Sequence, residues 1–328
     1  MTSGSPQRRR ITALGDLAWD VVVKPSEDLQ YASDVTGEIT VAPGGAAANF
    51  AVWVARCGAP AGFIGMVGND PFAPLLEDDL AREGVEARLP RSSERPTAVV
   101  LVLVDQKGQR TMVTNQGADY LLEPEQVDAE FIASSVHLHI TGYSLITDPP
   151  RSAARHALSI AKAAGCTVSL DPASAHLLGA SLGAQRFLEF AQEVGADVLL
   201  PNREEGELLT GEQDPQAMAR ALASAAPLVV LKLGQDGCLL IQGGRTHHLP
   251  APRLQALDAT GAGDAFDAAF LFKYLAGTKV LEAAQFATSV AAWVVMRPGA
   301  RPPVDQALAR LLGSSAKAAR TTWSKSSK

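Results

Sequence analysis

The chain has 328 residues, of which 47% are hydrophobic and 20% are charged, and its net charge at pH 7 is -6. These values predict a globular protein with ample core, and the acidic balance argues against nucleic acid or a membrane surface as a partner. A polar, basic start argues against a signal peptide, and no run of about 20 apolar residues predicts a membrane span. We therefore expect a cytoplasmic protein.

The three cysteines of the chain form no C-x-x-C pair, so we expect each to be buried rather than to bind zinc or form a disulfide.

The first third of the chain is rich in predicted strands. The apolar run 11–23 predicts two strands, the first ending near Gly15, and residues 37–43 predict another that stops at a proline and two glycines. Residues 46–58 carry apolar side chains at helical spacing and end on a glycine, which is typical of a helix. Two β-branched runs within 97–115 predict a hairpin.

From about Val136 onward, predicted strands and helices alternate regularly. Such alternation predicts a parallel sheet covered by helices on both faces. No linker, repeat or low-complexity segment interrupts it, so we expect one domain over 10–312. We expect flexible segments at 1–9 and 313–328.

Parallel sheets of this kind bind ligands outside the carboxyl ends of their strands, which directs attention to three loops. In the first, Gly44 and Gly45 allow a close backbone approach, and Asn49 is a polar residue in an otherwise apolar helix. A tight turn with a capping Asn is the purely structural alternative. In the second loop, Asn202 and Glu205 form either a helix-capping pair or a set of oxygen groups that hold waters around a magnesium ion.

The third loop has the sequence DATGAGDAF and lies at 258–266. Gly261 and Gly263 allow successive amides to converge, and a helix predicted from about Ala262 adds its positive end, which together predict an anion hole for a transferring phosphate. Asp264 beside that hole could accept a proton from an attacking hydroxyl, or it could act only as a helix cap. The phosphate-binding pattern G-x-x-x-x-G-K-[ST] does not occur in the chain.

Several of these stretches resemble the motifs of one family. The stretches PGGAAANFAVWVARCG and DATGAGDAFDAAFLF resemble the two signatures of the ribokinase-like (PfkB) carbohydrate kinases, and only Ala259 departs from the second. NREE resembles the magnesium motif of that family, KLGQDG its nucleotide loop, and RPGARPP its C-terminal nucleotide loop. The five motifs occur in the family order between residue 11 and about residue 312.

The resemblance implies a ribokinase-like three-layer α/β/α domain with a mainly parallel sheet, plus a small β-sheet lid built from strands near 16–24, 37–43 and 97–115. It implies an ATP-dependent kinase that transfers the γ-phosphate to a hydroxyl of an unphosphorylated sugar. Because such a lid exposes an apolar face, it also implies a possible homodimer through the lid.

The family also implies a role for each matching residue. Asp264 would be the base, and the amides of the preceding residues would form the anion hole. The sugar, the nucleotide with magnesium, and a potassium ion would be bound by further matching positions. The anion hole would be formed by Gly261, Ala262 and Gly263, and the sugar would be bound by Asp20, Gly44, Gly45 and Asn49. ATP would be bound by Asn202, Glu205, Lys232, Gly234 and Gly237, with Glu205 holding Mg²⁺ through water. The potassium ion would be bound by Asp258. Lys232 replaces a usual Thr, and Pro303 stands where ribokinase has a serine ligand for the cation.

The substrate has several possible identities. GGAAAN is nearer to the G-G-A-P-A-N of fructokinases and ketodeoxygluconate kinases than to the G-G-K-G-A-N of ribokinase, so ribose, fructose and 2-keto-3-deoxygluconate are the sugar types considered. A nucleoside kinase is the alternative, in which Trp19 would stack on a base rather than pack in the lid. A non-catalytic protein that senses a nucleotide or a sugar is a third reading.

Overall fold

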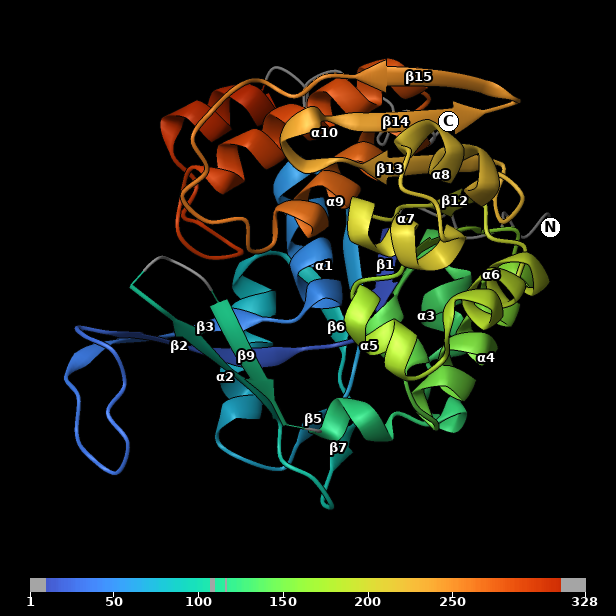
Figure 1. Ribbon diagram of the computed structural model, residues 1–328. Helices are drawn as coiled ribbons and strands as arrows, with labels where there is room; N and C mark the ends of the chain where they lie inside the picture. Colours follow the sequence, from blue (N-terminus) through green and yellow to red (C-terminus); the bar gives the residue numbers. More distant parts are fainter. Residues whose placement is uncertain (1–9, 107–109, 116, 314–328) are drawn as a thin grey trace.

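The computed structural model describes residues 10–106, 110–115 and 117–313, so the expectations for 1–9 and 314–328 lie outside the described residues. Within the described part, nine strands form one sheet in the order β15-β14-β13-β12-β11-β10-β1-β4-β6 (Figure 1). These strands are β1 Arg10–Leu14, β4 Ala61–Ile64, β6 Val85–Arg88, β10 Ser135–Thr141, β11 Thr167–Asp171, β12 Val198–Leu199, β13 Leu228–Lys232, β14 Cys238–Gln242 and β15 Arg245–Leu249. Every neighbouring pair of strands from β13 to β6 is parallel. Strands β14 and β15 add an antiparallel edge beside β13. That edge hairpin is not among the strands predicted from the sequence.

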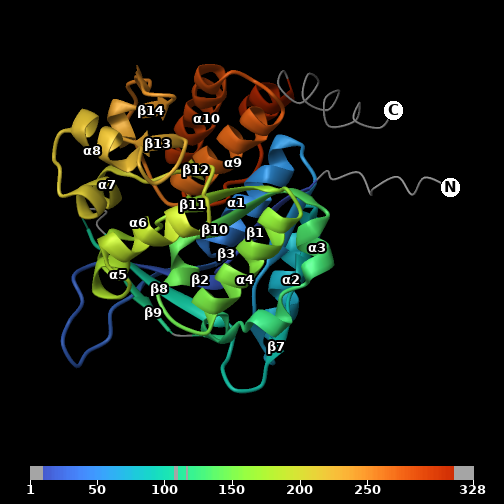
Figure 2. The same cartoon turned by 90° about the vertical axis from the view of Figure 1, so that its right-hand side faces the viewer.

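Helices cover both faces of the sheet, because its buried strands point alternate side chains to opposite sides. On β13, Leu228 and Val230 join one core, and Val229 and Leu231 join the other. The first core contains the helices α1 Ala46–Cys57, α2 Phe72–Arg82, α9 Ala262–Leu275 and α10 Val280–Val295. The second contains α3 Ala129–Ala133, α4 Pro150–Ala163, α5 Ala175–Ala180, α6 Ala184–Glu193, α7 Arg203–Thr210 and α8 Pro215–Leu222, most of which face the viewer in Figure 2. The predicted three-layer α/β/α architecture is confirmed.

Two central helices lie at different depths. Helix α9 is buried at every residue from Ala265 to Phe272, as expected for a stretch in which every residue but Asp267 is apolar. Helix α4 instead buries one side only, because its apolar residues recur at helical spacing. The three cysteines are buried, as expected. Among the described residues, no helix is both long and apolar enough to cross a membrane.

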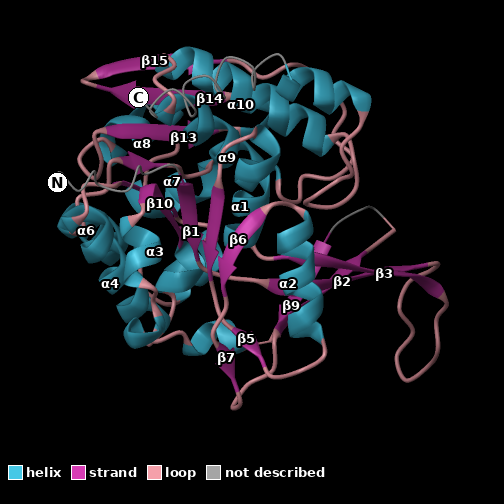
Figure 3. Ribbon diagram, turned by 180° about the vertical axis from the view of Figure 1, so that it is seen from behind, coloured by secondary structure: helices cyan, strands magenta, loops and turns pink. Residues whose placement is uncertain are grey.

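A second, four-stranded sheet forms the predicted lid. Its order is β3-β2-β8-β9, where β2 pairs antiparallel with β3 and parallel with β8. The strands are β2 Ala18–Pro25, β3 Gly37–Gly44, β8 Ala98–Val104 and β9 Arg110–Thr114, with β8 and β9 forming the predicted hairpin. Figure 3 shows this sheet projecting from the main domain beside α2. Short strands β5 Val67–Gly68 and β7 Arg91–Ser92 pair below it.

The order of the main sheet reverses at β1, the third strand from the β6 edge. Strand β1 lies between β10 and β4, so the chain leaves β1 toward one side and later returns on the other. In open α/β sheets the ligand site lies at the carboxyl ends of the strands next to such a reversal. The residues after β1, β10, β11 and β13 share this edge. Asp16 after β1 contacts the first turn of α1, and Lys232 of β13 lies near Gly263 in the first turn of α9.

Candidate active site

The loop between β3 and α1 needs both of its glycines. A Cβ on Gly44 would lie 2.4 Å from the Asp20 Oδ2 atom, so the Asp20 carboxylate packs directly against the Gly44 backbone. Gly45 has a φ of 93°, and a Cβ there would lie 2.5 Å from the backbone oxygen of Asp16. The structure therefore brings Asp20, Gly44 and Gly45 together, and the glycines are required by close packing.

The side chain of Asp16, a residue not predicted from the sequence, binds the first amides of α1. Its Oδ2 accepts a hydrogen bond from the Ala46 amide at 2.6 Å, and its Oδ1 accepts from the Ala47 amide at 3.2 Å and from Thr141 Oγ1 at 3.0 Å. Burial raises the pKa of the Asp16 carboxyl, and these hydrogen bonds partly oppose that rise. The positive end of the α1 dipole is thus compensated by the carboxyl group of a residue that follows β1. An acidic residue directly after a buried strand was the only available signal.

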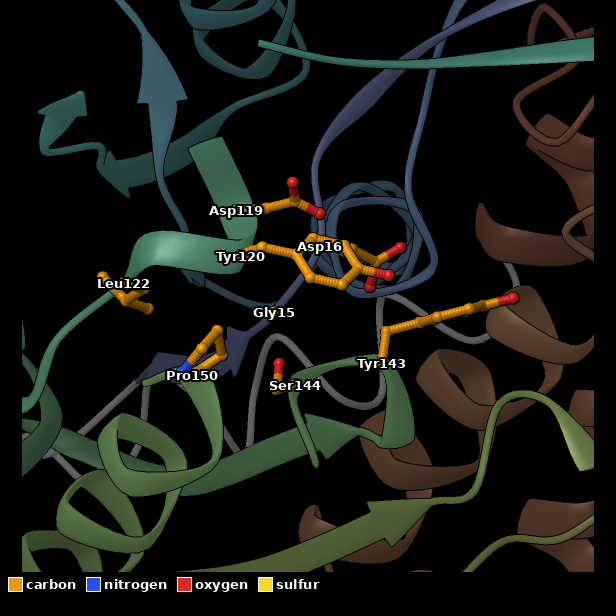
Figure 4. Close-up of a pocket in the computed structure, with 8 residues that line it drawn as sticks. All are labelled: Gly15, Asp16, Asp119, Tyr120, Leu122, Tyr143, Ser144 and Pro150. Carbon is orange, nitrogen blue, oxygen red and sulfur yellow. The ribbon is translucent and has the colours of Figure 1, made fainter. Parts of the chain in front are cut away.

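A small pocket lies beside Asp16. It is lined by Gly15, Asp16, Asp119, Tyr120, Leu122, Tyr143, Ser144 and Pro150. Figure 4 shows the side chains around it. Burial, with a further contribution from the charge of Asp16, raises the pKa of the Asp119 carboxyl to about 7. Asp119 Oδ1 is buried and has no hydrogen-bond partner among the described residues, so it can accept a donor from a ligand or a water.

A hydrogen bond joins the polar side chains of the two signature stretches. Asn49 Nδ2 on α1 donates to Asp264 Oδ2 on α9 at 2.8 Å. Burial raises the pKa of Asp264 to about 7; the Asn49 hydrogen bond lowers it, and the nearby Asp171 raises it. A carboxyl with such a pKa can accept a proton near neutral pH.

Helix α9 begins after Gly261, as predicted, and its first turn is open. Gly261 has a φ of 70°, and a Cβ there would lie 2.5 Å from Ala300 Cβ, so this glycine is required by the fold. A Cβ on Gly263 would meet only Lys232 Nζ, at 3.7 Å. Among the described residues, the structure shows no acceptor for the amides of Gly263 and Asp264, whereas the Ala262 amide donates to the Ala259 carbonyl at 3.2 Å. Free amides at a helix start are the feature that binds anions.

Lys232 lies beneath that open turn. Its Nζ donates to Asp171 Oδ2 at 2.7 Å and to Asp267 Oδ2 at 2.8 Å. Burial alone would lower the pKa of Lys232, but the two carboxylates raise it, so the lysine is charged. Asp171 and Asp267 were not predicted from the sequence. The role of Lys232 along a nucleotide stays a prediction, because its ammonium points to these two carboxylates.

Asn202 and Glu205 form a complete capping box at the start of α7. The Asn202 side chain accepts from the Glu205 amide at 2.9 Å, and the Asn202 amide and side chain donate to the Glu205 carboxylate at 2.8 Å and 2.7 Å. Burial and the charge of Asp171 raise the pKa of Glu205 to about 8. These oxygen groups suit magnesium. No group of three or more His, Cys, Asp or Glu in the described residues forms a metal cage, so a magnesium ion here would rely on water and phosphate oxygens.

The remaining predicted residues line nearby turns. Gly234 and Gly237 lie between β13 and β14, and a Cβ on Gly237 would lie 1.9 Å from the Leu249 carbonyl oxygen. Asp258 accepts from the Thr260 amide at 2.8 Å and from the Gly299 amide at 2.7 Å, so it joins the loop before α9 to the loop 297–303.

Trp19, on lid strand β2, packs against Phe72 at the start of α2. Its Nε1 donates to the Phe72 carbonyl at 3.3 Å, and the two rings lie 6.3 Å apart between centroids.

Comparisons with known proteins agree with this geometry. The pfkB family carbohydrate kinase model matches residues 8–307. A fructokinase from Klebsiella pneumoniae is 35% identical over 268 residues, which cover 80% of this chain and 83% of that protein. An adenosine kinase structure from Sinorhizobium meliloti superposes with a TM-score of 0.83 at 26% identity, covering 96% of this chain and 99% of that chain.

A putative ribokinase II from Escherichia coli, solved with ATP and Mg²⁺, superposes with a TM-score of 0.80 at 26% identity and covers 93% of this chain and 99% of its own. The family match spans nearly the whole described chain and both signature loops. The chain therefore belongs to the pfkB family of carbohydrate kinases, and it is a phosphotransferase with an alcohol group as acceptor.

Proposed function

We propose that this chain transfers the γ-phosphate of ATP to a hydroxyl of an unphosphorylated sugar. The observation that carries the proposal is the Asp264 carboxyl, which bonds Asn49 and lies beside the open amides at the start of α9. That arrangement places a base for the attacking hydroxyl beside an anion hole for the transferred phosphoryl group.

The chemistry follows from these groups. The hydroxyl proton of the sugar goes to Asp264 as the hydroxyl oxygen forms a bond to the γ-phosphorus. The bond between that phosphorus and the bridging oxygen of ADP breaks, and ADP leaves with the electron pair. The amides of Gly263 and Asp264 stabilise the charge on the phosphoryl oxygens. Magnesium, held through water by Asn202 and Glu205, would neutralise phosphate charge.

We infer that the sugar is a ketose of the fructose type. The fructokinase relative supports this choice, and so does the position of Trp19, whose contact with Phe72 accounts for its ring without a nucleobase. The carboxylates of Asp20 and Asp119 would accept hydrogen bonds from the sugar hydroxyls. A nucleoside substrate is the alternative, supported by the adenosine kinase neighbour.

Two further expectations belong to this proposal. A homodimer through the lid is supported by exposed apolar side chains on its outer strands, namely Ile39, Val41, Met112 and Val113. A potassium ion would be bound by Asp258 together with backbone carbonyl oxygens near it. Light scattering checks the first expectation, and comparing the activity in potassium with that in sodium checks the second.

A coupled ADP-release screen over pentoses, hexoses, keto-sugar acids and nucleosides tests the function. We expect turnover with fructose and little with nucleosides. Faster turnover of a nucleoside than of any sugar would favour the alternative. Binding of ATP and a sugar without turnover of any compound would overturn the kinase assignment and favour a sensing protein.

A further inference from the structure

The loop 297–303, which the resemblance assigns to the nucleotide, sends one side chain to the sugar-facing loop. Arg301 is buried, with 5% of its side chain exposed. Its Nε donates to Asn49 Oδ1 at 2.7 Å, its Nη1 to Asp79 Oδ2 at 2.7 Å, and its Nη2 to the Gly44 carbonyl at 3.3 Å. One guanidinium therefore connects α1, α2 and the glycine turn.

These contacts determine which way the Asn49 amide faces. An arginine can only donate hydrogen bonds, so the amide oxygen of Asn49 must point to Arg301. The amide nitrogen then points to Asp264, to which it donates. The flipped amide would set N–H groups against the guanidinium and an oxygen against the carboxylate, and both contacts would be repulsive.

We propose that Arg301 is a positioning residue for phosphoryl transfer: it orients the Asn49 amide, which then holds the Asp264 carboxylate and favours its ionised form. This inference rests on the proposed function of Asp264 as the base. Arg301 itself touches neither Asp264 nor, in the proposed arrangement, the reacting atoms. Its effect on the base passes through Asn49.

The other charged groups around Asp264 come from different elements. They are Asp171 at the end of β11, Asp16 after β1, and Lys232 at the end of β13. The phenol of Tyr143 is also near Asp264. Replacing Arg301 together with its partner Asp79 leaves all of them in place and keeps the net charge of the site, so a change in the titration of Asp264 then reports on the Asn49 hydrogen bond.

The chain offers a matched control in Arg56. Its Nη1 donates to the Pro302 carbonyl at 3.0 Å, so it holds the same loop, and its partner Glu83 follows α2. The Arg56 guanidinium donates twice to Glu83, at 2.9 Å and 2.6 Å, and its side chain is 7% exposed. No contact joins Arg56 to Asn49 among the hydrogen bonds of the described residues. Both arginines are buried at the loop 297–303 and each pairs with a carboxylate, but of the two only Arg301 donates a hydrogen bond to Asn49 in the described part of the chain.

The experiment compares the pair variants R301Q/D79N and R56Q/E83Q. Changing both partners avoids a buried unpaired carboxylate. The kcat of each is measured with ATP and the sugar from the screen, from about pH 5.5 to about pH 9. In R301Q/D79N we expect the acidic limb of kcat to move up by about one pH unit, which is about a tenfold loss below the limb. In R56Q/E83Q we expect a lower melting temperature with the limb unchanged.

The same pair in an Asn49→Ala background tests the path. If Arg301 acts through Asn49, R301Q/D79N adds no further shift there. An equal shift in both backgrounds, or an equal shift in R56Q/E83Q, would overturn the proposal. Should R301Q/D79N fail to fold, Arg301→Lys keeps the charge but lacks the fork needed for three acceptors, and it should show the same shift.

A measurement without turnover separates this proposal from the proposed function. The protein is labelled at the aspartate carboxyl carbons, and Asp264 is titrated by NMR, with Asp264→Asn identifying its signal. A raised pKa in R301Q/D79N supports the coupling even if no sugar is phosphorylated. An unchanged pKa overturns the coupling even if the enzyme is an active kinase.

Discussion

Helices α1 and α9 start in the same way, but the first amides of α1 are already hydrogen-bonded, whereas two of those of α9 are open to a ligand. Both follow a glycine with a positive φ, 93° at Gly45 and 70° at Gly261, and neither has a side-chain cap from that residue. The two helices pack side by side (Figure 1). At α1 the first amides donate to Asp16. At α9 the amides of Gly263 and Asp264 have no acceptor among the described residues. The comparison teaches that a glycine before a helix becomes an anion site only where the protein leaves the amides unfilled.

The largest effect that sharpens this contrast is expected for Asp264→Asn. The structure rules out the capping alternative, because α9 is preceded by Gly261 and Asp264 makes no side-chain cap. Asn keeps the shape of Asp264 but cannot accept the proton, so kcat should fall by about 10²–10⁴-fold. In the wild type, kcat should rise with pH through about 7, because the Asp264 carboxyl must be ionised to act and its pKa lies there.

The stability of the same variant provides its control. Because the folded-state pKa of Asp264 is raised from 3.8 to about 7, ionisation disfavours the folded state, and the Asp264 contribution to stability should decline as the pH rises between these two values and level off above about 7. Asp264→Asn should show a smaller decline, because Asp119 and Glu205 also have raised pKa values and still contribute. A near wild-type kcat in a well-folded Asp264→Asn protein would reject the base assignment.

The next effect concerns the open turn of α9. Gly263→Ala should fold normally, because a Cβ there meets only Lys232 Nζ at 3.7 Å. The added methyl group would enter the space proposed for the phosphoryl group, so we expect a kcat loss of about tenfold to 10²-fold. Gly261→Ala is the contrasting variant, since its positive φ and the contact with Ala300 predict a loss of stability. Full activity of Gly263→Ala would contradict an anion hole at this turn.

A smaller effect is expected at Glu205, which both caps α7 and is proposed to organise magnesium. Glu205→Gln should raise the Mg²⁺ concentration needed for activity by about tenfold, the range seen when groups outside a metal's direct ligands are changed. A capping role alone predicts a stability loss of about 1 kcal/mol with unchanged magnesium dependence. A magnesium titration and a melting curve on one variant separate the two roles.

The smallest effect is expected at the filled start of α1. Asp16→Asn keeps one acceptor oxygen for the two amides of Ala46 and Ala47 and loses the other, so we expect a stability loss of about 1 kcal/mol and little change in kcat. Chemical denaturation measures the first quantity and the coupled assay the second. A kcat loss as large as that of Asp264→Asn would break the comparison between the two helices.

Much of this molecule could be predicted from short stretches of sequence. The glycine turns and the apolar helices that follow them are local patterns, and they predicted the starts of α1 and α9. The pairing of Asn202 with Glu205 was predictable as a capping box because the two residues lie within one helical turn. Lys232 shows the limit of such prediction. Its position in a loop motif predicted a nucleotide contact, but Asp171 and Asp267 converge on it from two other elements.

The sequence by itself determined which chemical groups are present and how each local segment turns, because those properties depend on neighbours a few residues away. Only the tertiary structure decided which groups meet. Asn49 bonds Asp264 across 215 residues and Arg301 across 252, and Asp16 bonds Thr141 across 125. Parallel strands bring their carboxyl ends to one edge whatever their separation along the chain, and the order of strands in the sheet selects which ends are neighbours. That order depends on the packing of all the layers together, so no single stretch of residues encodes it.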